Sequence, residues 1–389
     1  MKDILLVFKL KFLEINKYNQ LWLYIIFILM MILSLKKKVE GFNSEELSIY
    51  AMQHKDSWEL QLEFLKEYED KYDGLILDLK LDDLPNDNNI RAKFRGTSIA
   101  QEIRTRQKEG ILKSFPIILF SANDKTQQAL EKSGTDLFDI IIDKSKLNEI
   151  AFPIYTRQLI DLAKGYKYLC DSSLTTEKIF QIDIPFIDTR FLSEFCELRK
   201  APVHIQTKFL ITEFLTKQGL LIDEDVLAAR LGINKAISTD WNMLLEELSK
   251  NKYNGVFNKG WPRWWMHLVE KWWSESIKSD SILRSTPAKE RVEIIKQATG
   301  LEHLIAAEKI SKADSDEFWT LCKGCHLPLD PVDGLIIQGQ DNLYPWQEPE
   351  YVSVDAALWR RNIDDWISVA DVEKERYDEL KVIYSRKKQ

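Results

Sequence analysis

The sequence predicts an α/β domain with a parallel sheet, followed by a mostly α-helical domain with a small β element. In the first half, short apolar runs alternate with segments of helical periodicity, a pattern typical of strands joined by helices. The second half holds ten of the 12 tryptophans, so we expect the two halves to fold as different domains. The length of 389 residues is sufficient for about two or three domains.

The strands and helices of the first half follow one another along the chain. Residues 58–72 place apolar side chains at helical spacing, and the buried strand GLILD comes next. Residues 97–109 begin at a Thr or Ser cap and predict a helix, which leads to a second strand over 115–122. A third strand over 137–143 precedes a long amphipathic helix over 146–170. This order predicts a parallel sheet that is covered on both faces.

Function in such a sheet lies at the carboxyl ends of the strands. The three strands end in Asp78, Ser121 and Lys144. An acid can act as a nucleophile, a hydroxyl can hydrogen-bond to a bound anion, and a lysine can supply the counter-charge. The ordered set therefore predicts an anion site on three successive strands.

The segments that carry these residues resemble the receiver domain of bacterial response regulators. They are DGLILDLKLDDLP, RGTSIAQEIR, FPIILFSAND and FDIIIDKS, within roughly residues 47–165. The resemblance implies a flavodoxin-like fold with strand order 2-1-3-4-5 and transfer of a phosphoryl group to an aspartate from a histidine kinase or a small phosphodonor. It implies that Asp78 is the phosphoacceptor, Ser121 the switch hydroxyl and Lys144 the lysine that pairs with the phosphoryl group.

The resemblance also implies a Mg²⁺ site. Asp78 and the backbone carbonyl of Lys80 would be ligands, in keeping with the preference of Mg²⁺ for oxygen. Gly96 matches the glycine that precedes the third helix of the family. Two smaller departures are Ser145, where the family usually has proline, and Ile141, where an aromatic switch residue often stands.

Two further departures concern a loop and the first strand. The loop from Asp82 to Arg95 is longer than usual. In the family, two acids at the end of the first strand hold the Mg²⁺. Here that position falls on Met30 and Met31, so the acid pair is missing. In the chain as written, we expect Mg²⁺ binding and phosphorylation of Asp78 to be weakened or lost.

The apolar run around these methionines has three interpretations. A membrane anchor over residues 18–35 would tether the protein to the inner membrane, although the run from Leu21 to Leu35 is shorter than the about 20 residues of a typical span. Lysines on both sides give the anchor no orientation. The second interpretation is a degenerate receiver whose first strand has lost its acids.

The third interpretation is a shifted reading frame. Met30, Met31 and Ile32 must be encoded by a sequence that begins ATGATGAT. Read from the last base of the Met30 codon, the same bases give GAT GAT, which encodes two aspartates. The codons of Lys36–Lys38 can form a run of adenines, where a base is readily gained or lost. Residues 1 to about 36 would then be an out-of-frame remnant of the first receiver strand, a hypothesis that the gene sequence tests.

The predicted domain organisation follows from these observations. The segments are an apolar N-terminal segment over 1–38, a receiver-like domain over 39–165, a connector over 166–200, a helical Trp-rich domain over 201–320, and a CxxC turn with a small β element and a terminal helix over 321–389.

The segment 221–248 has the form helix, Gly-containing turn, helix. Ala228, Leu231 and Gly232 stand as in a helix-turn-helix, which would make the chain a DNA-binding response regulator. The second helix, however, offers Lys235 among several acids, and DNA readers carry a basic face. The net charge of −7 gives no overall attraction to nucleic acid either. A helical interaction domain is therefore the favoured interpretation.

The segment GWPRWWMHLVEKWW, 260–273, predicts a helix with Pro262 in its first turn and tryptophans on one broad face. The favoured interpretation is a core helix, because aromatic side chains bury large areas. The alternative is a surface for partner docking or base stacking.

The motif CKGCH contains Cys322 and Cys325. Its spacing matches haem c attachment, but that chemistry needs an exported protein, and a reducing cytoplasm is expected from the cysteine content. Half of a zinc site is a second interpretation, and zinc is not favoured because a closed site needs two more ligands. A redox pair is a third, and two buried cysteines are the default. The candidate additional ligands, none with paired spacing, are His326, His303, Cys170 and Cys196.

The sequence therefore predicts a cytoplasmic signalling protein rather than an enzyme, apart from phosphorylation and dephosphorylation of its own aspartate. We expect Asp78 to control a contact between the C-terminal half and an unknown protein partner. The architecture distantly resembles adaptors of bacterial conflict and phage-defence gene clusters. Nucleic acid is a less favoured partner, and association with a membrane is left open.

Overall fold

The computed structural model divides the chain into two compact units. The described residues are 24–30, 40–79, 81, 85, 89–121, 136–363 and 365–386. Unit 1 consists of residues 1–173 and 201–208, and unit 2 consists of residues 174–200 and 209–389. The predicted connector, 166–200, is therefore shared between the units, because the last helix of the α/β domain continues beyond residue 165.

Unit 1 is built on a five-stranded sheet in which every neighbouring pair is parallel. The strand order is β2-β1-β3-β4-β5, which is the flavodoxin-like doubly wound order and confirms the predicted topology. The strands are β1 (Tyr24–Met30), β2 (Leu47–Gln53), β3 (Gly74–Asp78), β4 (Ile117–Ser121) and β5 (Ile140–Asp143).

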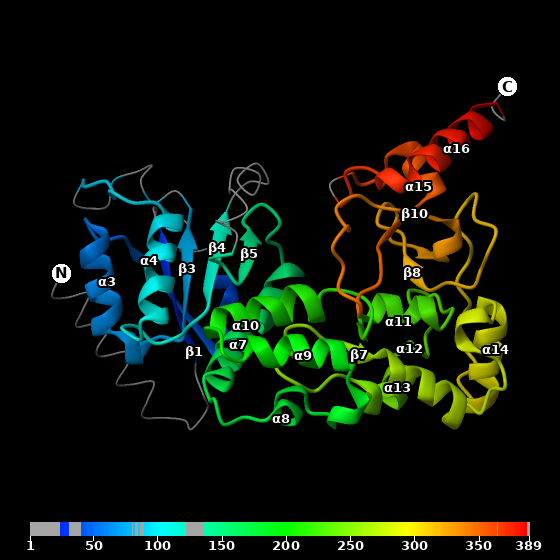
Figure 1. Ribbon diagram of the computed structural model, residues 1–389, viewed down its shortest axis with the longest axis horizontal. Coiled ribbons are helices and arrows are strands. Elements are labelled where there is room, and N and C mark those ends of the chain that lie inside the picture. The colour runs from blue at the N-terminus through cyan, green and yellow to red at the C-terminus, as the bar shows by residue number, and fades with distance from the viewer. Residues whose placement is uncertain are drawn as a thin grey trace. The chain divides into compact units, whose positions relative to one another are not determined.

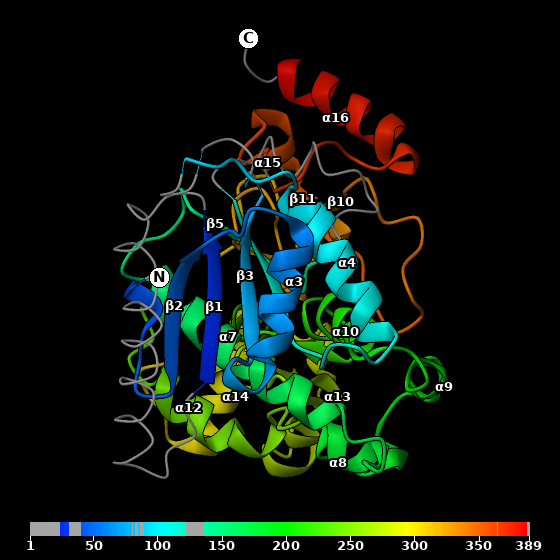
Figure 2. The same cartoon turned by 90° about the vertical axis from the view of Figure 1, so that its left-hand side faces the viewer.

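Helices cover both faces of this sheet. Figure 2 shows α3 and α4 in front of the sheet and α7 behind it. Alternate residues of β3 divide between the faces, and Leu75 and Leu77 pack into the cluster formed with α3 and α4. Phe120 of β4 faces the other side, where its ring lies 6.4 Å from that of Phe42. In the described part of residues 1–173, the helices are η2 (Glu40–Phe42), α3 (Trp58–Glu67), η3 (Glu69–Lys71), α4 (Gly96–Lys108) and α7 (Ala151–Leu169).

The proposed membrane anchor is wrong for its described part. Residues 24–30 form β1, and this strand pairs with β2 on one side and with β3 on the other. The backbone groups of this strand therefore find their partners within the sheet. Among the described residues, no helix is long and apolar enough to cross a membrane. The rest of the segment 18–35 lies outside the described residues.

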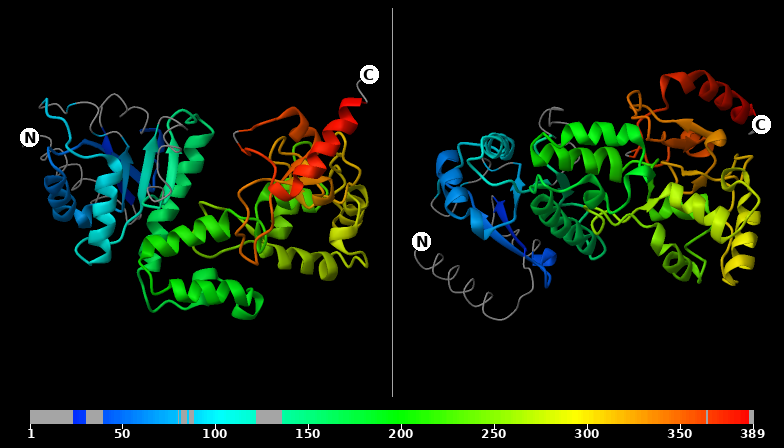
Figure 3. Two further views of the ribbon diagram at one scale, coloured as in Figure 1. Left: turned by 45° about the horizontal axis from the view of Figure 1, so that its top comes forward. Right: turned by 60° about the horizontal axis from the view of Figure 1, so that its bottom comes forward.

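Unit 2 combines short helices with three two-stranded antiparallel sheets, β6–β7, β8–β9 and β10–β11. Figures 1 and 3 show its last two α-helices, α15 and α16, at the orange and red end of the chain. In chain order its strands are β6 (Leu221–Ile222), β7 (Trp264–Trp265), β8 (Thr320–Leu321), β9 (Pro328–Leu329), β10 (Gly334–Ile336) and β11 (Tyr351–Ser353).

The helices along the described second half of the chain are mostly short. They are α8 (Thr176–Phe180), η4 (Ile184–Phe186), α9 (Thr189–Leu198), α10 (Val203–Phe209), η5 (Leu210–Leu215), α11 (Glu224–Arg230), α12 (Trp241–Glu247), η6 (Leu248–Asn251), α13 (Met266–Lys271), η7 (Trp272–Ser276), η8 (Leu283–Ser285), α14 (Ala288–Thr299), η9 (Pro331–Asp333), α15 (Val354–Trp359), η10 (Asp371–Glu373) and α16 (Lys374–Arg386).

The Trp-rich segment does not form one helix from Pro262 onward. Its residues Trp264–Trp265 pair as β7 with β6, and helix α13 begins only at Met266. The core interpretation is confirmed and the docking-surface interpretation is wrong, because all the tryptophans of the segment are buried. Their exposures are at most 6%, for Trp261, Trp264, Trp265, Trp272 and Trp273.

The predicted helix-turn-helix has a different geometry in the structure. Its two helices, α11 and α12, are separated by residues 231–240, whereas a helix-turn-helix uses a turn of about 3–4 residues. Gly232 has a positive φ of 73°. Lys235 is held by two carboxylates, 3.1 Å from Glu224 and 2.6 Å from Asp225. Its charge is therefore neutralised within the unit.

Candidate functional site

Asp78 and Lys144 form an ion pair at the carboxyl edge of the sheet. Lys144 follows the last residue of β5, and its Nζ donates a hydrogen bond to Oδ2 of Asp78 at 2.7 Å. Each side chain is only 9% exposed. Since parallel strands end at the same edge, residues that are far apart in the sequence meet here, as predicted.

Ser121 and Phe120 belong to the same edge. Asp78 pairs in register with Phe120, and Ser121 pairs with Asp143, directly before Lys144. The backbone N–H of Lys144 donates to the carbonyl of Ser121 at 2.7 Å. The Lys144 ammonium also lies 4.9 Å from the centre of the Phe120 ring, a cation–π contact that the sequence analysis did not anticipate. Strand β4 therefore contacts both the backbone N–H and the side-chain ammonium of Lys144.

Gly96 presses against the backbone of Asp78. A Cβ at Gly96 would lie 2.4 Å from the carbonyl oxygen of Asp78, and the Gly96 N–H donates to the carbonyl of Leu79 at 3.0 Å. Only glycine permits such a close approach. The glycine that the resemblance singled out is thus part of the support beneath Asp78.

The described residues do not fit a Mg²⁺ site. The first strand ends in Met30, in register with Gln53 of β2, and a thioether is not a ligand that Mg²⁺ prefers. The carboxylate of Asp78 is already paired with Lys144. Among the described residues, no group of three or more His, Cys, Asp or Glu side chains is placed to hold a metal ion. Met31 and Lys80, which were also predicted to bear on the metal, lie outside the described residues.

A second charged cluster in unit 1 escaped the sequence analysis. Arg104 of α4 donates to Asp139 at 2.8 Å, and the Tyr166 hydroxyl of α7 donates to the same carboxylate at 2.5 Å. Asp139 also accepts from the N–H of Ile117 at 2.7 Å. Burial raises the pKa of Tyr166 well above its ordinary value. These contacts lie at the amino ends of β4 and β5, away from the strand ends that carry function, so they tie two helices to the sheet.

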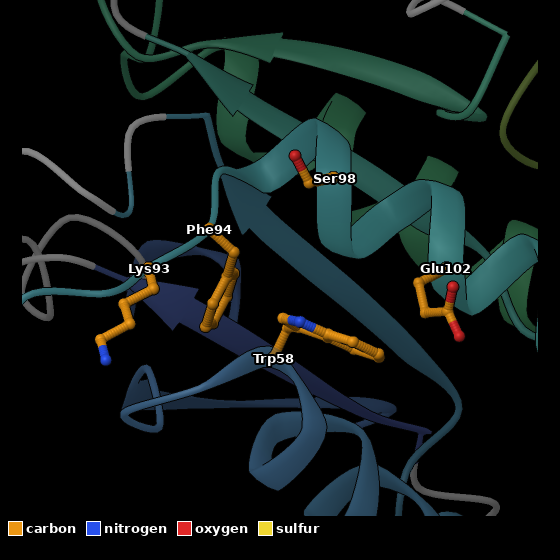
Figure 4. A pocket seen from close by; sticks show the side chains of 5 residues that line it. All are labelled: Trp58, Lys93, Phe94, Ser98 and Glu102. Carbon is orange, nitrogen blue, oxygen red and sulfur yellow. The ribbon is translucent and has the colours of Figure 1, made fainter.

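A shallow hollow of about 210 Å³ lies beside α3 and α4. Figure 4 shows Trp58 and Phe94 close to each other, with Ser98 and Glu102 extending from α4. None of the three strand-end residues lines it, and it adds nothing to the candidate site.

Cys322 and Cys325 occupy the turn between β8 and β9. Cys322 is fully buried, and its Sγ accepts N–H groups from Ser353 at 3.1 Å and from Gly324 at 3.3 Å. A hydrogen bond from Cys325, with a smaller contribution from Ser353, lowers the pKa of Cys322 to about 5. The hydrogen bond between the two cysteines raises the pKa of Cys325. His326 pairs instead with Asp365 at 3.2 Å, so it does not complete a metal site.

Comparisons with known proteins leave the family open. No family model and no curated protein matches the sequence. Among solved structures, the chain is similar to a sensor protein from Polaromonas sp. JS666, with 15% identity and a TM-score of 0.27, over 36% of this chain and 98% of that one. It is also similar to the response regulator LqsR of Legionella pneumophila, with 12% identity and a TM-score of 0.28, over 60% of this chain and 76% of that one. At these TM-scores neither likeness carries an argument about function.

Proposed function

We propose that unit 1 is a receiver-type regulatory domain with Asp78 as its phosphoacceptor. One observation carries the proposal, namely the 2.7 Å pair of Lys144 and Asp78 at the carboxyl edge of a sheet in flavodoxin-like order. An acid, a hydroxyl and a lysine on neighbouring strand ends form a set that can accept and then sense a phosphoryl group.

The proposed chemistry uses the Asp78 carboxylate as the nucleophile. One of its oxygens bonds to phosphorus while the bond from phosphorus to the donor breaks, and the donor leaves with that electron pair. Lys144 then loses its carboxylate partner and pairs with the phosphoryl oxygens instead. Ser121 supplies the hydroxyl that senses the new charge. A histidine kinase or a small phosphodonor would supply the phosphoryl group.

We propose that the natural chain accepts this group slowly. Met30 replaces one of the acids that would bring a metal ion to the reacting phosphate, so among the described residues the charge is offset by Lys144. The regulatory output is then set mainly by the Asp78–Lys144 pair. This applies to the chain as written; if residues 1 to about 36 are read out of frame, the in-frame first strand would carry the acid pair and the reaction would not be slowed in this way.

The proposed output is a protein contact made by unit 2. Several large apolar side chains of this unit stay exposed after α15 begins, and we propose that they contribute to the contact. Their exposures reach 78% for Ile367 and 83% for Val372. An adaptor role in a bacterial conflict or defence system fits such a contact. The DNA-binding alternative has less support, because Lys235 is neutralised by Glu224 and Asp225.

Incubation of the full chain with acetyl phosphate and Mg²⁺ tests the proposal. Acyl phosphate trapped by reduction should map to the peptide that contains Asp78, at low yield, and Asp78→Asn should abolish it. The matched control is Asp143→Asn, an acid two strands away whose loss should leave the label in place. Label that persists in Asp78→Asn would sink the assignment of the acceptor.

A further inference from the structure

The turn between β8 and β9 has the internal geometry of a metal-binding turn. Cys322 and Cys325 are spaced as in a C-x₂-C zinc site. Within the turn, the N–H of Gly324 donates to Cys322 Sγ at 3.3 Å, and the N–H of His326 donates to the carbonyl of Cys322 at 2.8 Å. N–H groups directed at a cysteine sulfur are the second-layer contacts that orient a thiolate ligand.

Ser353 and Ala356 have the same x₂ spacing as the two cysteines, and their segment lies against the cysteine turn. Ser353 ends β11 and caps α15, because its Oγ accepts the N–H of Ala356 at 3.2 Å. Its own N–H donates to Cys322 Sγ at 3.1 Å, and Cys322 Sγ lies 3.3 Å from Ser353 Oγ. The Ser353 hydroxyl therefore lies as close to Cys322 Sγ as a second ligand of the same metal ion would lie.

The other end of this segment also meets the cysteine turn. A Cβ placed on Gly324 would come within 2.6 Å of the Cβ of Ala356. Both Ala356 and Cys322 are fully buried, and they belong to one apolar cluster against which Cys325 packs. The methyl group of Ala356 thus faces the loop that carries both sulfurs.

We propose that Ser353 and Ala356 occupy the third and fourth ligand positions of a tetrahedral thiolate site for Zn²⁺ or a similar thiophilic dication, of which the chain keeps Cys322 and Cys325. A methyl group offers no lone pair, and a serine hydroxyl is a poor zinc ligand beside thiolates. The natural chain joins this segment to the cysteine turn by N–H···S hydrogen bonds and apolar packing in place of a metal. This inference is independent of the function proposed for unit 1.

The test rebuilds the site in the full chain with Ser353→Cys and Ala356→Cys. The rebuilt chain should bind one equivalent of Co²⁺ with the visible absorption of a tetrahedral tetrathiolate complex, and Zn²⁺ should displace it. Adding Cys322→Ser to the rebuilt chain should remove that spectrum. The natural chain should show no such spectrum, and its melting temperature should be the same with and without a chelator.

The matched control is Ser353→Cys with Ala357→Cys. It carries the same number of thiols, and Ala357 is as fully buried as Ala356 but one residue further along α15. It should bind Co²⁺ only as weakly as Ser353→Cys alone, and it should not give the spectrum of a tetrathiolate complex. A folded rebuilt chain that behaves like this control would overturn the proposal.

The single variant Ser353→Cys keeps the test decisive if the rebuilt chain fails to fold without metal. Three thiolates from Cys322, Cys325 and position 353 should bind Co²⁺ more weakly, and Zn²⁺ should restore folding of the rebuilt chain. If the single variant binds no Co²⁺ and Zn²⁺ restores no folding, the four positions do not form a metal site and the proposal fails.

Discussion

Lys144 Nζ lies 2.7 Å from Oδ2 of Asp78, and both side chains are nine-tenths buried. The pairing is one cation to one carboxylate, because the first strand ends in Met30 where the receiver pattern has acids. In a site with three carboxylates, a single lysine leaves an excess of negative charge that a metal ion must balance. Here the described charges balance without one, so the pair itself holds the edge of the sheet together.

Removing the lysine should therefore destabilise unit 1. Lys144→Met leaves the Asp78 carboxylate buried without its cation, and breaking a buried pair costs about 3–5 kcal/mol. We expect a loss near the lower end of that range, since the pair retains some exposure. Urea unfolding followed by the far-UV circular dichroism of the full chain measures the change.

The control for this prediction is Lys164→Met. Lys164 pairs with Glu46 at 2.6 Å, but the two side chains are 40% and 47% exposed, and such exposed pairs contribute about 0.2–1 kcal/mol. Equal losses in the two variants would show that the Asp78–Lys144 pair is not buried as described. The double variant Asp78→Asn with Lys144→Met should recover much of the lost stability.

Gly96→Ala should both destabilise unit 1 and displace the backbone at Asp78 and Leu79. Its new methyl group would meet the Asp78 carbonyl at 2.4 Å, so the backbone must shift. We expect a loss of about 2–3 kcal/mol, similar to overpacking in a core. The comparison is Gly110→Ala, where nothing lies within 4 Å and only the positive φ of 73° is strained. That variant should lose about 1 kcal/mol. A Gly96→Ala loss no larger than this would contradict the close contact.

The buried cluster around Asp139 should matter more for stability than for any reaction. Asp139→Ala leaves the guanidinium of Arg104 buried without its carboxylate, and we expect a loss of about 3–5 kcal/mol. Tyr166→Phe removes one hydrogen bond to a charged group and should cost about 1.5–3 kcal/mol. Neither change touches Asp78. Thermal unfolding gives the stabilities, and the phosphorylation assay should give the natural yield for Tyr166→Phe below its melting temperature.

His204 should make unit 1 less stable in mild acid. Burial, assisted by the charge of Arg104, lowers the pKa of His204 from 6.5 to about 4. Between these two values the unfolded chain binds a proton that the folded chain does not, so the free energy of unfolding falls as the pH drops through this window. Urea unfolding at about pH 7 and about pH 5 should show a smaller drop for His204→Gln than for the natural chain. An unchanged drop would mean that His204 titrates normally when folded.

The parallel sheet was predictable because its strands are buried on both faces. GLILD matches β3 residue for residue, since a continuous apolar run bounded by a turn has few other structures open to it. Strand ends in such a sheet meet at one edge, so the proximity of Asp78 and Lys144 followed from the order of elements alone. Local pattern and topology agree in this half of the chain.

Relationships that depend on distant partners were not predictable. Trp264–Trp265 was expected to be helical from its spacing, but its backbone pairs with Leu221–Ile222, which lies far away in the sequence. The Asp139 cluster was missed because its members come from segments that are far apart in the sequence. Ser353 carries no sign of its position beside Cys322, because no periodicity reports a contact between two turns.

The central claim is that the carboxyl edge of this sheet is a phosphoacceptor site whose acid pair is missing. The most direct measurement is the yield of acyl phosphate at Asp78, with acetyl phosphate and Mg²⁺, in the full chain carrying Met30→Asp and Met31→Asp. The account predicts a yield at least about tenfold above that of the natural chain, dependent on Mg²⁺ and absent when Asp78→Asn is added. A folded variant with no label at Asp78, or with a label that ignores both changes, would contradict it.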